Sequence, residues 1–328
     1  MAARTTSFRL FLAVLILVIA ACSTPGATNT APTAGTDATA LIPTAPPPTS
    51  APTFPLTITD DEGTAVAIAA EPKKIVSLTP ATTETLFAIG AGSRVVGKVE
   101  DIADFPKEAA SVPIVATFSG VDVEKIVALG ADLVVSGGTG LTQGAAVEQL
   151  RNAGIPVLVS YPTTVEGALT SIRTIGTAVG LADAATTLAD TISGQIDDLS
   201  SIAGTVEDPP RVFYEIDVTG GIFTPPADSI YGEMFDLAGA ELIPGDVSYK
   251  ISLEELVAAD PEVILLGDAA YGATKAAVGK RAGWAGMTAV KNGAIYPVDD
   301  IVITRPGPRI AEGLKALIMA IHPELALT

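Results

Sequence analysis

The longest helical pattern of apolar and polar positions covers residues 181–202. Apolar side chains recur there at steps of three or four residues, so a helix would carry them on one face. These residues are Leu181, Ala185, Leu188, Ile192, Ile196, Leu199 and Ile202. At 1.5 Å per residue such a helix is about 33 Å long. This length favours a connector that joins two domains and packs against both.

Strand-like and helix-like patterns alternate over residues 56–180. The segments Leu56–Asp60 and Ala65–Ile68 flank a turn and predict a β-hairpin. After the hairpin, short apolar runs predict buried strands, and amphipathic stretches predict helices. The predicted strands cover residues 75–78, 95–99, 132–136 and 155–160, and the predicted helices cover 80–89, 123–129, 143–153 and 165–179. This alternation is typical of a mainly parallel sheet with helices on both faces.

The second half of the chain repeats the alternation. Its predicted strands cover residues 211–216, 263–266 and 294–298, and its predicted helices cover 229–238, 253–258 and 308–321. Residues 253–265 match residues 123–135 at a constant offset of 130 positions. We therefore predict an α/β fold with two Rossmann-like lobes, residues 56–180 and 206–328, joined by one long helix within residues 181–205. Ligands of open α/β sheets bind beyond the carboxyl ends of the strands, so two facing lobes would form a cleft there.

The N-terminus has the pattern of an export signal. Arg4 and Arg9 precede an apolar run that ends in the tetrapeptide Ile19–Cys22. That tetrapeptide resembles the bacterial lipobox, which implies removal of residues 1–21 as a signal peptide and lipidation of Cys22. An ordinary signal peptide or a membrane anchor is the alternative, although the run is shorter than the ~20 residues of a spanning helix.

Residues 22–55 are rich in Thr, Ala and Pro and predict a semi-extended tether. We expect an extracytoplasmic protein, in the periplasm or at the cell surface, that is held to the cell membrane by its lipid alone.

Charge and composition exclude several function classes. The chain has 19 Lys and Arg against 37 Asp and Glu, a net charge of −18, which argues against nucleic-acid binding. One Cys and one His, His322, argue against a disulfide framework and the usual His-rich metal sites. Catalytic motifs such as Gly-x-Ser-x-Gly and the phosphate-binding loop are absent from the sequence. Asp299 and Asp300 could form an acid–base pair, but neighbours on a predicted strand point to opposite faces.

Four short segments, in this order along the chain, match the pattern of a known family. They are Ser77–Glu84, Ile126–Val134, Ala238–Glu241 and Arg305–Arg309. Together with the lipobox, the tether and the connecting helix, they make residues 56–328 resemble the substrate-binding proteins of ABC importers, in particular the branch for cobalamin, ferric siderophores and haem. The resemblance implies two lobes that move little, a permease with its ATPase as partner, and neither a cofactor nor an enzymatic activity.

The resemblance also implies a docking surface for the permease. In this family one surface carboxylate on each lobe pairs with arginines of the permease, and these carboxylates correspond to Glu84 and Glu241. Charge-assisted carboxylate–guanidinium pairs suit the role because they fix the orientation of two proteins. The alternative for Glu84 is an acidic residue that stabilises the first turn of its own helix.

Ligand contacts are expected at two kinds of position. Arg305 and Phe118 correspond to cleft residues of the family, where a guanidinium could pair with a polar group and a flat ring could lie against a macrocycle. Three tyrosines in predicted loops are further candidates, although ordinary half-buried packing explains them equally well; they are Tyr161, Tyr249 and Tyr271. Trp284 is expected in the core, Arg309 in a structural role, and His322 is not expected to bind a metal ion.

The ligand is ranked by the chemistry that each class needs. A corrinoid needs mainly aromatic and polar contacts, which Phe118 and the tyrosines supply, so it comes first. A ferric siderophore comes second because Arg305 is the one good cationic candidate for an anionic chelate. Haem comes third, since no Tyr lies in a recognised iron-binding motif. A surface-anchored enzyme and a sensory module without transport are the alternatives from other functional classes.

Overall fold

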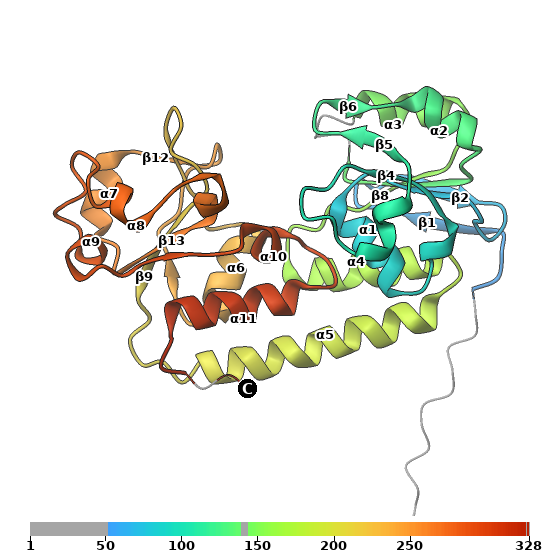
Figure 1. Ribbon diagram of the computed structural model, residues 1–328. Coiled ribbons are helices and arrows are strands. Elements are labelled where there is room, and N and C mark those ends of the chain that lie inside the picture. The colour runs from blue at the N-terminus through green and yellow to red at the C-terminus, as the bar shows by residue number, and fades with distance from the viewer. Residues whose placement is uncertain (1–51, 139–143, 326, 328) are drawn as a thin grey trace, which may run out of the picture. The chain divides into compact units, whose positions relative to one another are not determined.

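The computed structural model describes residues 52–138, 144–325 and 327, which belong to one compact unit (Figure 1). Cys22, the predicted signal peptide and most of the predicted tether lie outside the described residues. None of the helices in the described part of the chain is both long enough and apolar enough to cross a membrane.

The N-terminal lobe contains a six-stranded sheet that is parallel except for one edge strand. In sheet order its strands are β6 (Gly120–Val121), β5 (Ile114–Thr117), β4 (Val95–Val99), β3 (Ile75–Ser77), β7 (Leu133–Ser136) and β8 (Val157–Val159). The predicted hairpin forms as β1 (Leu56–Thr59) and β2 (Ala65–Ile68). The prediction of a mainly parallel sheet is confirmed.

Helices cover both faces of this sheet. They are α1 (Pro80–Ala88), α2 (Val123–Leu129), α3 (Gly144–Asn152) and α4 (Val165–Ala178), with 3-10 turns at Gly92–Arg94 and Lys107–Ser111. One set of buried strand side chains packs on α2 and α3, and the other set packs on α1 and α4. The helices begin where the sequence provides caps, because the side chains of Thr79 and Asp122 accept hydrogen bonds from the first turns of α1 and α2.

The C-terminal lobe contains a smaller, four-stranded parallel sheet. In sheet order its strands are β11 (Glu241–Leu242), β9 (Arg211–Glu215), β13 (Val263–Leu266) and β14 (Ile295–Pro297), and a separate pair is formed by β10 (Ile222–Phe223) and β12 (Lys250–Ile251). The helices are α6 (Ile230–Leu237), α7 (Leu253–Ala259), α8 (Lys275–Val278), α9 (Thr288–Asn292), α10 (Asp300–Thr304) and α11 (Ile310–Ile321), with a 3-10 turn at Gly267–Tyr271. The two matching segments of the sequence form the same unit, α2–β7 in one lobe and α7–β13 in the other.

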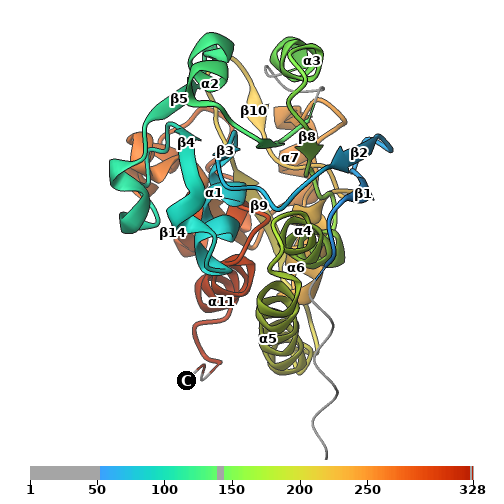
Figure 2. The same ribbon diagram turned by 90° about the vertical axis from the view of Figure 1, so that its right-hand side faces the viewer.

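The long connecting helix is α5 (Ala182–Ala203), and it packs on α4 in the first lobe and on α6 and α11 in the second (Figures 1 and 2). Small residues let α4 and α5 approach closely, since a Cβ at Gly176 would lie 2.1 Å from the Cβ of Ala185. The largest cluster of buried apolar side chains runs without a break from the first lobe along α5 into the second. A shared core of this kind resists large changes in the angle between the lobes.

The C-terminal segment differs from the prediction in two places. The strand expected over residues 294–298 ends at Pro297, and Asp299 and Asp300 begin the short helix α10 instead of lying on a strand. The last helix begins at Ile310, two residues later than predicted. The reason is the Arg305–Arg309 segment with its two prolines, which forms a separate connection between α10 and α11.

Candidate ligand-binding cleft

The carboxyl ends of β3, β7 and β8 open onto a cavity of about 170 Å³ between the lobes. The N-terminal lobe contributes the first turn of α1, Gly137 after β7 and Tyr161 after β8, and the C-terminal lobe contributes Arg305 and Pro306. Tyr161 also lines an adjoining hollow of about 560 Å³ that includes Asp61 and Glu62. The cavity therefore lies where the sequence predicted a cleft.

The C-terminal lobe adds a second hollow of about 450 Å³ that is rich in aromatic side chains. It is lined by Tyr214, Ile216, Asp217, Phe223, Tyr231, Tyr249, Asp300 and Thr304. Burial raises the pKa of Tyr231, and the nearby Tyr249, Asp300 and Tyr161 raise it further. Tyr161, which belongs to the other lobe, lines the interlobe cavity but not this hollow.

Tyr249 is held in a conformation that residues other than glycine rarely adopt, with φ = 63°. The surrounding hydrogen bonds fix it there. Asp246 Oδ1 accepts from the N–H groups of Ser248 at 2.7 Å and Lys250 at 3.0 Å, and the Tyr249 carbonyl accepts from the Thr224 N–H at 2.9 Å. Strained backbone that is fixed by its surroundings is common at binding sites. The loop thus directs one specific side chain to the hollow.

Asp300 lines the same hollow and accepts a hydrogen bond from a buried tyrosine. The hydroxyl of the fully buried Tyr214 donates to Asp300 Oδ1, while Asp299 caps α10 through the N–H of Ile301 at 3.1 Å. Burial raises the pKa of Asp300, although the hydrogen bond from Tyr214 opposes this effect. The two neighbouring aspartates therefore have different structural roles.

Four charged residues form a buried cluster between the lobes: Glu84 of α1, Asp101 after β4, and Arg305 and Arg309 between α10 and α11. We call them the interlobe charge cluster. Arg305 Nη1 lies 2.7 Å from Glu84 Oε1 and 2.9 Å from Asp101 Oδ2, and Arg305 Nη2 donates to Asp101 Oδ1. Arg309 binds Glu84 with two donors, Nε at 2.9 Å and Nη2 at 2.8 Å, and its guanidinium stacks on Phe105. The two carboxylates and two guanidiniums balance each other.

The cluster changes how two predicted site residues are interpreted. Glu84 was expected on the surface, but it is 2% exposed because two guanidiniums of the other lobe cover its carboxylate. Arg305 lines the cavity as expected, yet both of its terminal nitrogens are already bonded to carboxylates. Glu241, the other predicted docking residue, is exposed at the start of β11. Whether either glutamate meets a permease stays a prediction.

A second interlobe contact lies close to Tyr161. The N–H of Val165, in the first turn of α4, donates to Glu233 Oε2 of α6 at 2.7 Å. A carboxylate at this place also complements the positive end of the α4 dipole. Among the described residues, this contact joins the two lobes in addition to the interlobe charge cluster.

The remaining predicted residues lie elsewhere. Phe118 is 94% exposed in the turn between β5 and β6, and Tyr271 is 76% exposed at the end of a 3-10 turn; neither lines the cavities described above. Trp284 is buried and packs edge-on against Phe213, so the core prediction is confirmed. His322 is buried with Nε2 3.0 Å from the Gly239 carbonyl oxygen.

Sequence reasoning missed Tyr231, Phe223 and Asp101. Tyr231 lies in a helix that was correctly predicted, but helical spacing alone does not separate a cleft residue from a core residue. Phe223 belongs to a two-residue strand that no periodic pattern could reveal. Asp101 did carry a usable signal, because it follows the predicted strand 95–99 at its carboxyl end.

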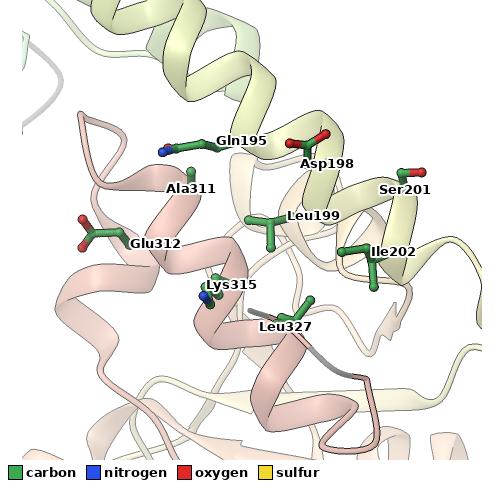
Figure 3. A pocket seen from close by; sticks show the side chains of 9 residues that line it. All are labelled: Gln195, Asp198, Leu199, Ser201, Ile202, Ala311, Glu312, Lys315 and Leu327. Atoms are coloured by element: carbon green, nitrogen blue, oxygen red, sulfur yellow. The ribbon is translucent and has the colours of Figure 1, made fainter.

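A further hollow lies between the helices α5 and α11 (Figure 3). Its lining mixes apolar side chains such as Leu199 and Ile202 with Asp198, Glu312 and Lys315. It contains neither strand ends nor aromatic side chains, so the interlobe cavity is the better ligand site. In the described residues, no group of three or more His, Cys, Asp or Glu side chains is arranged to hold a metal ion.

Two α/β lobes joined by a long helix, with a mainly apolar cavity between them that includes Tyr161 and Arg305, define the architecture of a two-lobed binding protein. Comparison with known proteins agrees. The model of the periplasmic binding protein family matches residues 75–302, and the chain belongs to this family. The predicted fold class and family are thereby confirmed, and the family places the chain outside the cytoplasm.

Three similar proteins illustrate the range of the family. The ABC transporter substrate-binding lipoprotein YvrC of Bacillus subtilis is 35% identical, over 83% of this chain and 87% of that protein. A cobalamin-binding protein of Halobacterium salinarum is 30% identical, over 82% of this chain and 74% of that protein. The haem-binding protein RhuT from Roseiflexus has a similar structure, with a TM-score of 0.67, 24% identity, and coverage of 77% of this chain and 99% of RhuT.

Proposed function

We propose that this protein captures a corrinoid in the interlobe cleft and delivers it to the permease of an ABC importer. The observation that carries this proposal is the chemistry of the cleft. Tyr161 lines the cavity between the lobes, and Tyr214, Tyr231 and Tyr249 line the hollow of the C-terminal lobe that includes Thr304, next to Arg305. Arg305, the only basic residue among the described residues that line these cavities, is already paired with two carboxylates. Aromatic rings suit the flat face of a neutral macrocycle. The name of the Halobacterium relative supports the same ligand class.

The competing ligands need groups that this cleft does not supply. A tris-catecholate iron chelate and the propionates of haem carry negative charge, whereas the cavities are lined by Asp61, Glu62, Asp217 and Asp300. Iron is bound by a tyrosine as the phenolate, and burial raises the pKa of both Tyr231 and Tyr249, which disfavours that form. An iron chelate or haem is therefore the alternative cargo, and the corrinoid is preferred.

A transport role accounts for the rest of the chain. Under this proposal the cargo leaves unchanged, so the protein is not an enzyme. Residues 1–21 direct export, Cys22 carries the lipid, and residues 22–55 form the tether between the membrane and the folded body. The lobes 56–180 and 206–328 bind the ligand, with residues 181–205 as their connection.

Docking of the permease is proposed to begin at Glu241, because its carboxylate is exposed at the edge of the C-terminal sheet. Glu84 can meet a partner arginine only after Arg305 and Arg309 release it. The substitution Glu241→Arg should lower uptake into cells at least tenfold and leave the ligand Kd unchanged, because carboxylate–guanidinium pairs fix docking. The control is Glu254→Arg, an exposed acid of the same lobe. Normal uptake with Glu241→Arg would remove the residue from the docking surface.

The ligand is tested by calorimetric and absorbance titration of the purified protein with cyanocobalamin, haem and a ferric tris-catecholate. We expect 1:1 binding of cyanocobalamin. The double substitution Tyr231→Ala with Tyr249→Ala should weaken it at least tenfold, roughly the loss of two ring contacts. Tyr296→Ala is the matched control, since Tyr296 and Tyr249 are both 36% exposed and Tyr296 lies outside these cavities.

Two results would contradict the corrinoid proposal. One is tight binding of haem or the catecholate without binding of cyanocobalamin. The other is equal loss of affinity in the tyrosine double variant and in the Tyr296→Ala control, because the cleft tyrosines would then have no special role. Phe118→Ala and Tyr271→Ala, titrated in parallel, test whether these exposed rings contribute to the same site.

A further inference from the structure

The most unusual feature of the cleft is an arginine at its wall whose positive charge is already paired with carboxylates. Arg305 lines the same cavity as Tyr161 and the first turn of α1. An arginine in a ligand site normally offers a planar fork that binds carboxylates with two hydrogen bonds. Here Asp101 occupies that fork from the N-terminal lobe, since its two oxygens accept from the two terminal nitrogens of Arg305.

Asp101 is itself held in place for this interaction. It directly follows Glu100 at the carboxyl end of β4, and its Oδ1 also accepts from the Ala103 N–H at 3.0 Å. Burial alone would raise the pKa of Asp101, but the hydrogen bonds from Arg305 and Ala103 outweigh this effect and lower it. The carboxylate is therefore ionised at neutral pH and remains a permanent partner for the guanidinium.

Glu84 completes the arrangement and could not replace Asp101. Its carboxylate is shared between Arg305 and Arg309, and Arg309 takes two of the three hydrogen bonds. Without Asp101 the cluster would hold two guanidiniums against one carboxylate, with one excess positive charge at the cavity wall. Asp101 is thus the residue that decides whether Arg305 is available to a ligand.

We propose that Asp101 is a specificity-determining residue, which occupies the fork of Arg305 and thereby keeps ligands that carry carboxylates out of the cleft. This inference rests on the proposed binding of a macrocycle between the lobes. It assigns Asp101 a selective role beyond holding the lobes together. A purely structural salt bridge would have no influence on which of two equally shaped ligands binds.

The test compares two ligands that share one ring and differ in charge. Dicyanocobinamide carries amide side chains, and dicyanocobyrinic acid carries carboxylic acids on the same corrin ring. In the full-length protein, Asp101→Asn should strengthen binding of the acid roughly ten- to hundredfold, because hydrogen bonds to charged groups are strong, and change binding of the amide less than about twofold. The gain should shrink as salt concentration rises, since added salt screens charge.

The matched control is Asp104→Asn. Asp104 is exposed in the same loop, has a φ of 46° that Asn tolerates, and loses the same charge. We expect this variant to bind both corrinoids like the parent protein. The double variant Asp101→Asn with Arg305→Gln should lose the gain for the acid, because the freed guanidinium is then absent.

Several outcomes would overturn the assignment. An equal change for acid and amide would show that Asp101 only holds the lobes together, and no change for either would remove it from the site. A similar gain in Asp104→Asn would indicate a general charge effect. If Asp101→Asn does not fold, Glu84→Gln replaces it, because it also frees a bond of Arg305, and it should shift selectivity in the same direction by a smaller factor.

Failure of the proposed function gives a different result. If the parent protein binds neither corrinoid, the corrinoid proposal is wrong, and the pair of haem and haem dimethyl ester repeats the charge comparison on another ring. A gain for haem over its ester in Asp101→Asn would then support the role of Asp101 independently of the cargo. Equal responses to both would reject it.

Discussion

Two carboxylate–arginine clusters within the described residues differ in charge balance. The interlobe charge cluster has two carboxylates and two guanidiniums from different lobes. The second cluster lies within the C-terminal lobe and has two carboxylates, Glu215 and Asp268, against Arg281 alone. We call it the C-lobe acidic cluster. Glu215 is fully buried, and Arg281 binds both of its oxygens while lying 4.6 Å from the Trp284 ring.

The two clusters shift the pKa of one of their acids in opposite directions. In the balanced cluster the pKa of Asp101 lies below its ordinary value. In the C-lobe acidic cluster, burial and then the neighbouring Glu215 raise the pKa of Asp268 to about 6. Its Oδ1 is buried and has no hydrogen-bond partner within the described residues. Burial and a second carboxylate, offset by only one guanidinium, thus favour the protonated form of Asp268 below about pH 6. Charge balance, rather than burial alone, decides in which direction the pKa of each acid moves.

The comparison predicts that the two clusters tolerate loss of an arginine differently. Arg281→Gln should lower the free energy of unfolding by about 3–5 kcal/mol, because it leaves the buried carboxylate of Glu215 without a counter-charge. Arg309→Gln should cost only about 1–2 kcal/mol, since Arg305 still pairs with Glu84 at 2.7 Å. Urea denaturation at pH 7 measures both values.

Lys280→Gln serves as the control for this pair, because Lys280 is exposed beside Arg281 and loses the same charge. We expect it to change stability by less than about 0.5 kcal/mol. Equal losses of stability for Arg281→Gln and Arg309→Gln would contradict the comparison, because Arg305 would then not compensate for the loss of Arg309 at the carboxylate of Glu84.

Both clusters show where sequence reasoning ends. Elements set by neighbouring residues could be predicted, such as α2 with its Asp122 cap and the connecting helix α5 with its apolar face. Two-residue strands such as β10 could not, because they depend on partners elsewhere in the chain. The same holds for charge. Arg305 and Glu84 are 221 residues apart, so the sequence presents each as a free charge and only the fold pairs them.

The cleft was predicted for a related reason. In an α/β fold the carboxyl ends of the strands meet at one edge, so the loop with Tyr161 could be placed there from the order of elements. Which tyrosines line a cavity depends on details of the loops. Tyr249 does so through a backbone conformation fixed by Asp246, whereas Tyr271 ends a turn that leaves it exposed. Residue type alone does not distinguish the two.

The smallest expected effect concerns pH, and the two clusters should respond with opposite signs. The pKa of Asp268 is higher in the folded protein, at about 6, than its ordinary value of 3.8. Its proton therefore stabilises the fold fully below about pH 4, and this stabilisation is lost as the pH rises through 6. The pKa of Asp101 is lowered, so its contribution is present above pH 3.8 and is lost as the pH falls through its folded pKa.

Asp268→Asn tests this difference, because an amide stays neutral at every pH. The variant should match the parent protein at pH 4 and exceed its free energy of unfolding by about 1 kcal/mol above pH 7, a value reduced for the partial exposure of the side chain. Asp101→Asn should instead lose stability at pH 7 and approach the parent protein in acid. Urea denaturation between pH 3 and 8 measures both profiles. If the free energy of unfolding of Asp268→Asn changed between pH 4 and 6 as it does in the parent protein, the group that binds the proton in this range would not be Asp268.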